Sequence, residues 1–412
     1  MNPRLTSLQS YPFEKLQALI EHITPAPSRT RLTLAIGEPQ HPAPAFVHQA
    51  LEEHWRSVSS YPSTRGPRAL REVMAHWLER RFQLPALDPD RHVLPASGTR
   101  EALFGAVQTA VGERFGGERP VVILPNPFYQ IYEGAALLAG AEPYYLNTTA
   151  DSGYRMDFSA VPPAIWRRTC LVFVCSPGNP TGTVVSQRAL QELLELAARH
   201  DFMLASDECY SEIYFDEDQP PPGLLQAAAD AGVHDYQRCL VFHSLSKRSS
   251  LPGLRSGFVA GDPAFLAAFH TYRTYQGSAL SSLAQAVSLR AWSDETHVRA
   301  NRDLYRQKFD AVLALLGPTC GATRPDAGFY LWLRTPVADD VFARELYAEE
   351  NLLVLPGSYL SREAWGRNPG QGYVRIALVA SPAECIEAAE RIRRYTLSVA
   401  PTGALHGYSG RH

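Results

Sequence analysis

A lysine lies in a short loop of small and hydroxyl-bearing residues, directly after an apolar segment typical of a strand. The run Ser244-Leu-Ser-Lys247 follows Leu240–His243, and Arg255 lies a few residues further on. Ligands of α/β proteins commonly bind at the carboxyl ends of such strands. Two hydroxyls, an amine and a guanidinium could hold an anion there. Taken alone, the tetrapeptide is more typical of a solvated basic loop.

Two further polar segments follow predicted strands. Asp207 and Tyr210 come directly after Met203–Ser206, and Asn179 lies in a run of turn-forming residues after Leu171–Cys175. A carboxylate buried at the end of a strand needs a partner, because an unpaired buried charge is costly. Each segment taken alone is more typical of a surface turn.

A fourth segment, Gly98-Thr99-Arg100, precedes a helical pattern. The unpaired N–H groups and the dipole at the start of a helix could hold a phosphate. An ordinary helix cap is the alternative interpretation.

Alternating strands and helices must position these segments. Another predicted strand is Val121–Leu124, and helical patterns cover residues 101–114, 130–139 and 187–200. This alternation predicts a parallel sheet covered by helices. From about residue 296, a long charged helix, two strands (328–333 and 373–378) and a final helix indicate a smaller α+β unit.

Composition and missing motifs narrow the classes of protein. The 412 residues, 45% of them hydrophobic and 20% charged, exclude a disordered chain, a collagen and a coiled coil. A net charge of −3 without a basic run argues against general nucleic-acid binding. The sequence contains no P-loop, G-x-G-x-x-G, H-E-x-x-H or G-x-S-x-G motif.

Location and metal content can also be predicted. The N-terminus lacks the pattern of a signal peptide, and no apolar run is long enough to span a bilayer. Six cysteines without a C-x-x-C pair predict neither a zinc site nor a disulfide framework. A cytoplasmic protein without a bound metal is therefore expected.

Taken in order, the polar segments resemble the class I/II, fold-type I aminotransferases, which depend on pyridoxal 5′-phosphate. The resemblance extends from Leu34-Ala-Ile-Gly37-Glu-Pro to Tyr373-Val-Arg375-Ile. It implies an α/β fold, with a mostly parallel seven-stranded sheet flanked by helices and a small α+β domain. It places the large domain at 45–295 and the small domain at 1–44 and 296–400, followed by a flexible tail at 401–412.

The resemblance implies a role for each polar residue near the cofactor ring. Lys247 would condense with the cofactor aldehyde and later move a proton, since a primary amine is needed for both. Asp207 would keep the pyridine nitrogen protonated. Asn179 and Tyr210 would donate hydrogen bonds to the ring oxygen, and Phe128 would stack on the ring.

Other residues are implied at the phosphate and at the substrate. The phosphate would contact the following residues: Gly98, Thr99, Arg100, Ser244, Ser246 and Arg255. Tyr61 resembles a tyrosine that reaches the phosphate of a neighbouring subunit, which implies a homodimer with shared active sites. Arg375 would hold the substrate α-carboxylate in a bidentate fork, assisted by the Gly37 N–H and by Asn179.

The N-terminal segments 2–16 and 36–44 resemble bacterial succinyldiaminopimelate aminotransferases. Glutamate would then be the amino donor and N-succinyl-2-amino-6-oxopimelate the acceptor. Such a substrate ends in carboxylates, so a distal cation is expected, and Arg273 is the candidate, with a solvated helical arginine as the alternative. Aspartate, alanine, aromatic amino acids and acetylornithine are alternative donors.

Three other classes of protein are possible. A C–S β-lyase would use the same lysine and cofactor. Ser244-x-x-Lys247 formally matches the S-x-x-K of acyl-serine enzymes, although the K-T-G motif of those enzymes is missing. A transcription regulator with an aminotransferase-like domain would need an N-terminal DNA-binding extension, for which the early Gly37-Glu-Pro motif leaves no room.

Overall fold

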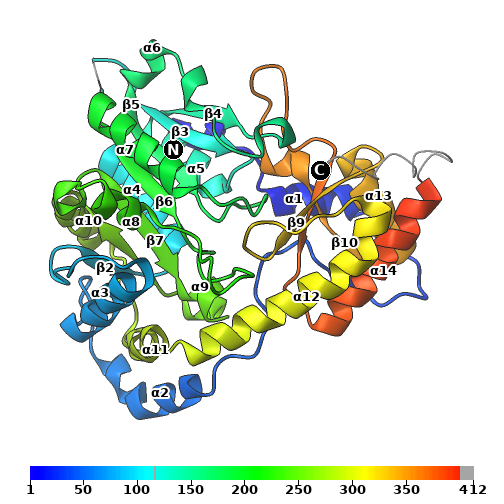
Figure 1. The fold of residues 1–412 in the computed structure, drawn as a ribbon, viewed down its shortest axis with the longest axis horizontal. Helices are drawn as coiled ribbons and strands as arrows, with labels where there is room; N and C mark the ends of the chain where they lie inside the picture. The colour runs from blue at the N-terminus through cyan, green and yellow to red at the C-terminus, as the bar shows by residue number, and fades with distance from the viewer. Residues whose placement is uncertain (116, 400–412) are drawn as a thin grey trace.

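A seven-stranded sheet forms the centre of the computed structural model, which describes residues 1–115 and 117–399 (Figure 1). From edge to edge the strands are β2 (Val93–Ala96), β8 (Gly257–Gly261), β7 (Cys239–Ser244), β6 (Met203–Asp207), β5 (Thr169–Cys175), β3 (Val121–Asn126) and β4 (Glu142–Asn147). Strand β8 is antiparallel to both of its neighbours, and the other pairings are parallel. The predicted mostly parallel sheet is confirmed.

The strands are apolar on both faces because helices cover both faces. Alternate residues of β3 illustrate this, since Val122 and Leu124 contribute to one core cluster and Val121 and Ile123 to another. The first cluster includes residues of α4 (Thr99–Ala110), α5 (Gln130–Ala139) and α10 (Pro263–Gln276). The second includes residues of α3 (Arg68–Phe82), α7 (Gln187–His200), α8 (Leu224–Asp230) and α11 (Ser282–Ser293). Such two-sided burial is typical of parallel sheets.

A smaller unit contains a three-stranded antiparallel sheet in the order β11-β12-β9. Its strands are β9 (Tyr330–Arg334), β11 (Leu355–Pro356) and β12 (Tyr373–Ala377), and its helices are α12 (Thr296–Cys320), α13 (Asp339–Glu350) and α14 (Pro382–Val399). In Figure 1 the long helix α12 extends from the side of α11 to α14.

The N-terminal segment joins this smaller unit. Strand β1 (Leu32–Thr33) pairs in parallel with β10 (Leu352–Leu353), and α1 (Pro12–Ile20) packs near α13. The predicted domain boundaries stay predictions, and the predicted tail at 401–412 lies outside the described residues. No helix in the described part of the chain is long and apolar enough to cross a membrane.

Three further α-helices are α2 (Phe46–His54), α6 (Pro163–Trp166) and α9 (Leu245–Arg248). Helix α9 follows β7 and carries the candidate lysine. After α9 and a short 3-10 helix (Pro252–Leu254) the chain returns as β8, antiparallel to β7. The carboxyl ends of β5, β6 and β7 therefore meet beside α9.

Candidate active site

A cavity of about 530 Å³ lies where these strand ends face β9 and β12. Most of the residues that the sequence singled out line it: Gly37, Thr99, Arg100, Asn179, Asp207, Tyr210, Ser244, Ser246, Lys247, Arg255 and Arg375. They come from segments far apart in the chain, and the parallel sheet brings them to one edge. The topology thus assembles the site.

Lys247 projects from α9 into this cavity. Its Nζ donates a hydrogen bond to the carbonyl oxygen of Gly37 at 2.5 Å. Burial, together with the positive charges of Arg375 and Arg255, lowers the pKa of Lys247 to about 8. A substantial share of the amine is therefore neutral near pH 8, as a nucleophile or a general base requires.

Asp207 lies at the end of β6 and is buried. The hydroxyl of Tyr132 donates to its Oδ2 at 2.6 Å, and the N–H of Cys209 donates to its Oδ1 at 3.3 Å. Burial raises the pKa of Asp207, although these hydrogen bonds oppose the shift. A positively charged group facing the carboxylate would keep it ionised. No sequence motif indicated Tyr132, which lies in α5.

Arg375 of β12 is buried and oriented by two hydrogen bonds. Its Nη1 donates to Asn179 Oδ1 at 3.0 Å, and its Nη2 donates to the carbonyl oxygen of Ala35 at 2.8 Å. Its Nε has no hydrogen-bond partner among the described residues. The guanidinium also lies over the ring of Tyr330, 4.5 Å from the ring centroid. A planar cation that is held in one orientation in this way suits the binding of a carboxylate.

Tyr330 is a second residue that the sequence analysis did not identify. Its hydroxyl lies 3.0 Å from the hydroxyl of Tyr210. A Cβ atom at Gly37 would overlap this hydroxyl and would lie 2.8 Å from Cζ of Tyr330. Glycine at position 37 therefore lets the N-terminal segment pass close to β9.

An anion cradle forms at the start of α4. Gly98 has φ +83°, and a Cβ atom there would overlap Nη2 of Arg255. The guanidinium thus lies against the glycine, beside the N–H groups at the start of the helix. Charge-assisted hydrogen bonds and a helix N-terminus together suit a phosphate.

Ser244 belongs to the same cradle. Its Oγ accepts a hydrogen bond from the Ser246 N–H at 3.1 Å and donates to the carbonyl oxygen of Ser256 at 3.4 Å. No hydrogen bond joins this hydroxyl to Lys247 among the described residues, so the geometry does not support an acyl-serine enzyme.

The structure corrects the prediction for Phe128. This ring is buried in the core between Tyr145 and the guanidinium of Arg362, and it does not line the cavity. The next residue, Tyr129, lines the cavity instead. Tyr129 directly precedes α5, where the chain turns after β3, and this turn decides which of the two rings faces the site.

The structure also corrects the prediction for Arg273. The guanidinium is fully buried and pairs with Glu101, Nε to Oε1 at 2.9 Å and Nη2 to Oε2 at 3.2 Å. It also donates to the carbonyl oxygens of Pro95 and Ser278. Arg273 does not line the cavity, so it is not a substrate ligand. It is not a solvated side chain either, because its buried guanidinium joins α10 to α4 through Glu101.

Tyr61 is fully exposed and does not line the cavity of its own chain. Its predicted contact with a neighbouring subunit stays a prediction.

An amine, a buried carboxylate, an anion cradle and an arginine fork together define a site for a phosphorylated cofactor and an amino acid. The family model of aminotransferase class I and II matches residues 29–392, and the chain belongs to this family. Members of the family use pyridoxal phosphate.

Relatives and solved structures resemble the chain over nearly its whole length. An LL-diaminopimelate aminotransferase of Desulforudis audaxviator is 30% identical, with 95% of this chain and 96% of the relative covered. An aminotransferase structure from Neisseria meningitidis has a TM-score of 0.92 at 46% identity and covers 96% of this chain and 100% of its own. A probable N-succinyldiaminopimelate aminotransferase from Thermus thermophilus has a TM-score of 0.80 at 26% identity, covering 93% and 99%.

The residues present fit the family's cofactor. Lys247 offers a primary amine for its aldehyde, Asp207 a buried carboxylate, and the closely packed pair Gly98 and Arg255 a cradle for its phosphate. When bound, pyridoxal phosphate supplies the aldehyde that exchanges amino groups and a ring that withdraws electrons.

Proposed function

We propose that the protein transfers the amino group of glutamate to an acceptor of the diaminopimelate class, by a ping-pong mechanism. The acceptor is N-succinyl-2-amino-6-oxopimelate, and the product is N-succinyl-LL-2,6-diaminopimelate. In this proposal Arg375 holds the α-carboxylate, and Lys247 moves the proton of the substrate Cα. The names of several relatives support a substrate of this class.

One observation carries the proposal, namely the guanidinium of Arg100 at the cavity. The phosphate contact expected of Arg100 can be made by its backbone N–H in the first turn of α4, which leaves the guanidinium for another group. Arg100 lines the cavity and is exposed, and its Nε donates to the hydroxyl of Tyr129 at 2.8 Å. This bond orients the guanidinium, and neither Nη group has a hydrogen-bond partner among the residues that the structure describes. Because Arg375 serves the α-carboxylate and Arg255 the phosphate, Arg100 replaces Arg273 as the candidate for a second carboxylate.

A panel of donors and acceptors tests the proposal. We expect purified protein, supplied with pyridoxal phosphate, to form glutamate from N-succinyl-LL-2,6-diaminopimelate and 2-oxoglutarate. Aspartate, alanine, aromatic amino acids and acetylornithine should be slower donors. Equal or faster turnover of any of these would contradict the proposed substrate.

The variant Arg100→Gln tests the second cation. It should raise the KM of glutamate roughly tenfold or more, since one charge-assisted interaction is lost. Alanine has no distal carboxylate, so its kcat/KM should be nearly unchanged. Equal losses for both donors would show that Arg100 does not bind the distal group.

A second candidate function is favoured by several relatives named LL-diaminopimelate aminotransferase. In that case unacylated LL-diaminopimelate would be the donor to 2-oxoglutarate, and the succinylated compound would react more slowly. Comparing kcat/KM for the two compounds separates the candidates. A C–S β-lyase would instead release pyruvate and ammonia from cystathionine without 2-oxoglutarate.

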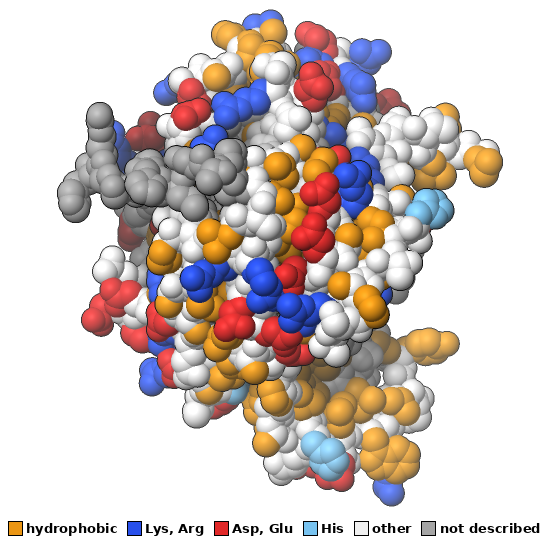
Figure 2. Space-filling view, turned by 90° about the vertical axis from the view of Figure 1, so that its right-hand side faces the viewer, with side chains coloured by type: hydrophobic (Ala, Val, Ile, Leu, Met, Phe, Trp, Pro, Cys, Tyr) orange, Lys and Arg blue, Asp and Glu red, His pale blue; other side chains and the backbone are white. Residues whose placement is uncertain are grey.

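We also propose that the protein is a homodimer with shared active sites. Trp55, Val58 and Tyr61 follow α2 and are strongly exposed, and hydrophobic side chains gather at the lower end of the molecule in Figure 2. An exposed apolar patch of this kind commonly marks an interface. Light scattering should give twice the chain mass, and Tyr61→Phe should weaken cofactor binding. A monomer with full activity would refute the proposal.

A further inference from the structure

A hydrogen-bonded chain of three polar residues lies beside the active site, and none of the roles described above involves these residues. It consists of His41, in the N-terminal segment, and Asn301 and Lys308, both on α12. Nζ of Lys308 lies 2.6 Å from Nε2 of His41, and Nδ1 of His41 lies 2.6 Å from Oδ1 of Asn301. Three residues from two distant segments thus form one continuous series of hydrogen bonds.

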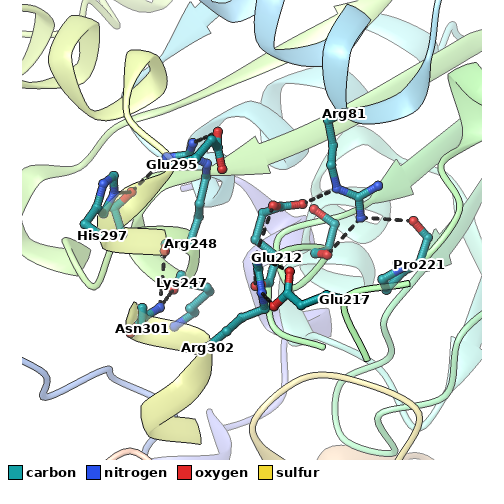
Figure 3. Close-up of polar contacts among 12 residues, drawn as sticks. Arg81, Glu212, Glu217, Pro221, Lys247, Arg248, Glu295, His297, Asn301 and Arg302 are labelled. Carbon is teal, nitrogen blue, oxygen red and sulfur yellow. Dashed lines mark hydrogen bonds and ion pairs between the residues drawn. The ribbon is translucent and has the colours of Figure 1, made fainter. Parts of the chain in front are cut away.

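One end of this chain holds the backbone of α9, the short helix that carries Lys247. Nδ2 of Asn301 donates to the carbonyl oxygens of Lys247, at 3.0 Å, and Arg248, at 3.2 Å. Figure 3 shows Asn301 beside these two residues. The same stretch of α12 holds the next residue, since Nε2 of His297 lies 2.8 Å from Oγ of Ser249. Helix α12 therefore holds the backbone of α9, from which the Lys247 side chain projects.

The other end holds the strand that carries the substrate arginine. Nζ of Lys308 donates to the carbonyl oxygen of Leu378 at 3.2 Å. Leu378 follows directly after β12, and Arg375 lies within β12. The chain of hydrogen bonds therefore connects the backbone at Lys247 with the backbone beside Arg375.

The direction of every hydrogen bond in this chain is determined. Carbonyl oxygens only accept, so Asn301 must donate through Nδ2 and accept through Oδ1. His41 must then carry its proton on Nδ1, which leaves Nε2 to accept from Lys308. Burial lowers the pKa of His41 to about 4, and the charge of Lys308 acts in the same direction, so this neutral form persists near pH 7.

Asn301 and Lys308 are buried and His41 is half-buried, at a cost that suggests a function. Lys308 is fully buried, and the ring of His41 lies 4.6 Å from the ring of Tyr305, centroid to centroid. An amine in such surroundings is unfavourable, and burial lowers the pKa of Lys308 to about 8. An apolar side chain would fill the same space without this cost, but it would not connect the two backbones.

We propose that His41, Asn301 and Lys308 are positioning residues that fix the Lys247 amine relative to the Arg375 guanidinium. A substrate held by its α-carboxylate at Arg375 then presents its Cα proton to the amine of Lys247. The inference rests on the roles proposed for Lys247 and Arg375, and it is independent of the acceptor.

Matched substitutions of His41 test the inference in the holoenzyme. His41→Phe keeps a ring against Tyr305 but removes both nitrogens, whereas His41→Gln keeps one acceptor and one donor. With glutamate we expect His41→Phe to lower kcat by roughly ten- to a hundredfold, as a displacement of about 1 Å can do. The KM and the cofactor dissociation constant should change less than about threefold, and His41→Gln should recover most of kcat.

A spectroscopic readout separates positioning from general destabilisation. The absorbance of the lysine-bound cofactor changes with pH, and the apparent pKa of this change depends on how Lys247 is held. It should shift in His41→Phe and stay near the wild-type value in His41→Gln. If His41→Phe does not fold, Asn301→Asp replaces it, because a carboxylate cannot donate to the Lys247 carbonyl.

The outcomes decide the inference without reference to the acceptor. It is overturned if kcat stays within twofold of wild type, if Gln at position 41 is as slow as Phe, or if the pKa of the absorbance change does not move. A wild-type protein that does not react with glutamate would refute the proposed donor. The comparison would then be made with whichever amino donor the wild type accepts.

Discussion

The substitution Gly98→Ala should separate the stability of the protein from its affinity for the cofactor. Gly98 has φ +83° and ψ 156°, in a region of backbone conformation that essentially only glycine adopts. An added Cβ would also lie 2.9 Å from Cζ of Arg255 and still closer to Nη2. The guanidinium must therefore move away from the anion cradle.

The two effects have different magnitudes and different consequences. Backbone strain of this kind costs about 1–3 kcal/mol and lowers the stability of the protein with or without the cofactor. If Arg255 holds the phosphate as proposed, displacing it removes a charge-assisted hydrogen bond worth about 1.5–3 kcal/mol. By the usual conversion this weakens cofactor binding by roughly ten- to a hundredfold.

Spectroscopic titration of the cofactor-free protein with pyridoxal phosphate measures the affinity, and thermal unfolding measures the stability. Gly112→Ala is a suitable control, because Gly112 lies just beyond the other end of α4 and its Cβ would meet only the Arg114 carbonyl oxygen at 3.8 Å. The control should bind the cofactor as the wild type does. Unchanged affinity in folded Gly98→Ala would refute the placement of the phosphate against Arg255.

Three further predictions follow from the same site. Burial lowers the pKa of Lys247 to about 8, so the neutral amine becomes dominant as the pH rises through about 8. Cofactor uptake by the cofactor-free protein should accelerate over the same pH range. Stopped-flow absorbance at several pH values measures the uptake rate, and a rate that does not change with pH would contradict this prediction. Asp207→Ala should lower kcat roughly a hundredfold or more, measured as glutamate turnover, and an unchanged rate would exclude its action on the cofactor ring. Arg375→Lys keeps the positive charge but loses the bidentate fork, so the KM of glutamate should rise at least about tenfold with little change in cofactor affinity. Equal losses of glutamate affinity and cofactor affinity would contradict the proposed role.

The sequence predicted the helices with strong local signals most accurately. Helices α5 and α7 span the predicted residues, and α7 begins after Ser186, whose hydroxyl accepts from the Ala189 N–H. Helix α4 covers Thr99–Ala110 and not 101–114, and strands β2, β4 and β8 were not predicted. These strands contain proline, glycine or mixed polar residues, so only their pairing in the sheet identifies them.

The site residues that belong to sequence motifs could be predicted. Those that reach the site only through tertiary contacts could not. Lys247, Asp207 and Arg375 stand in recognisable patterns, and the structure brings them to one cavity. Tyr132 and Tyr330 reach the site only because α5 and β9 pack against it, and nothing in their local sequence indicates this. The partner of Arg273 lies 172 residues away, so its burial could not be foreseen either.

The most direct test of the account is to identify the lysine that binds the cofactor. The chain contains three lysines, Lys15, Lys247 and Lys308, so the possible outcomes are few. After borohydride reduction of the protein with pyridoxal phosphate, mass spectrometry should find the cofactor on the peptide containing Lys247, and Lys247→Ala should lose both the adduct and the turnover. A cofactor attached to Lys15 or Lys308, or normal turnover by Lys247→Ala, would contradict the central claim.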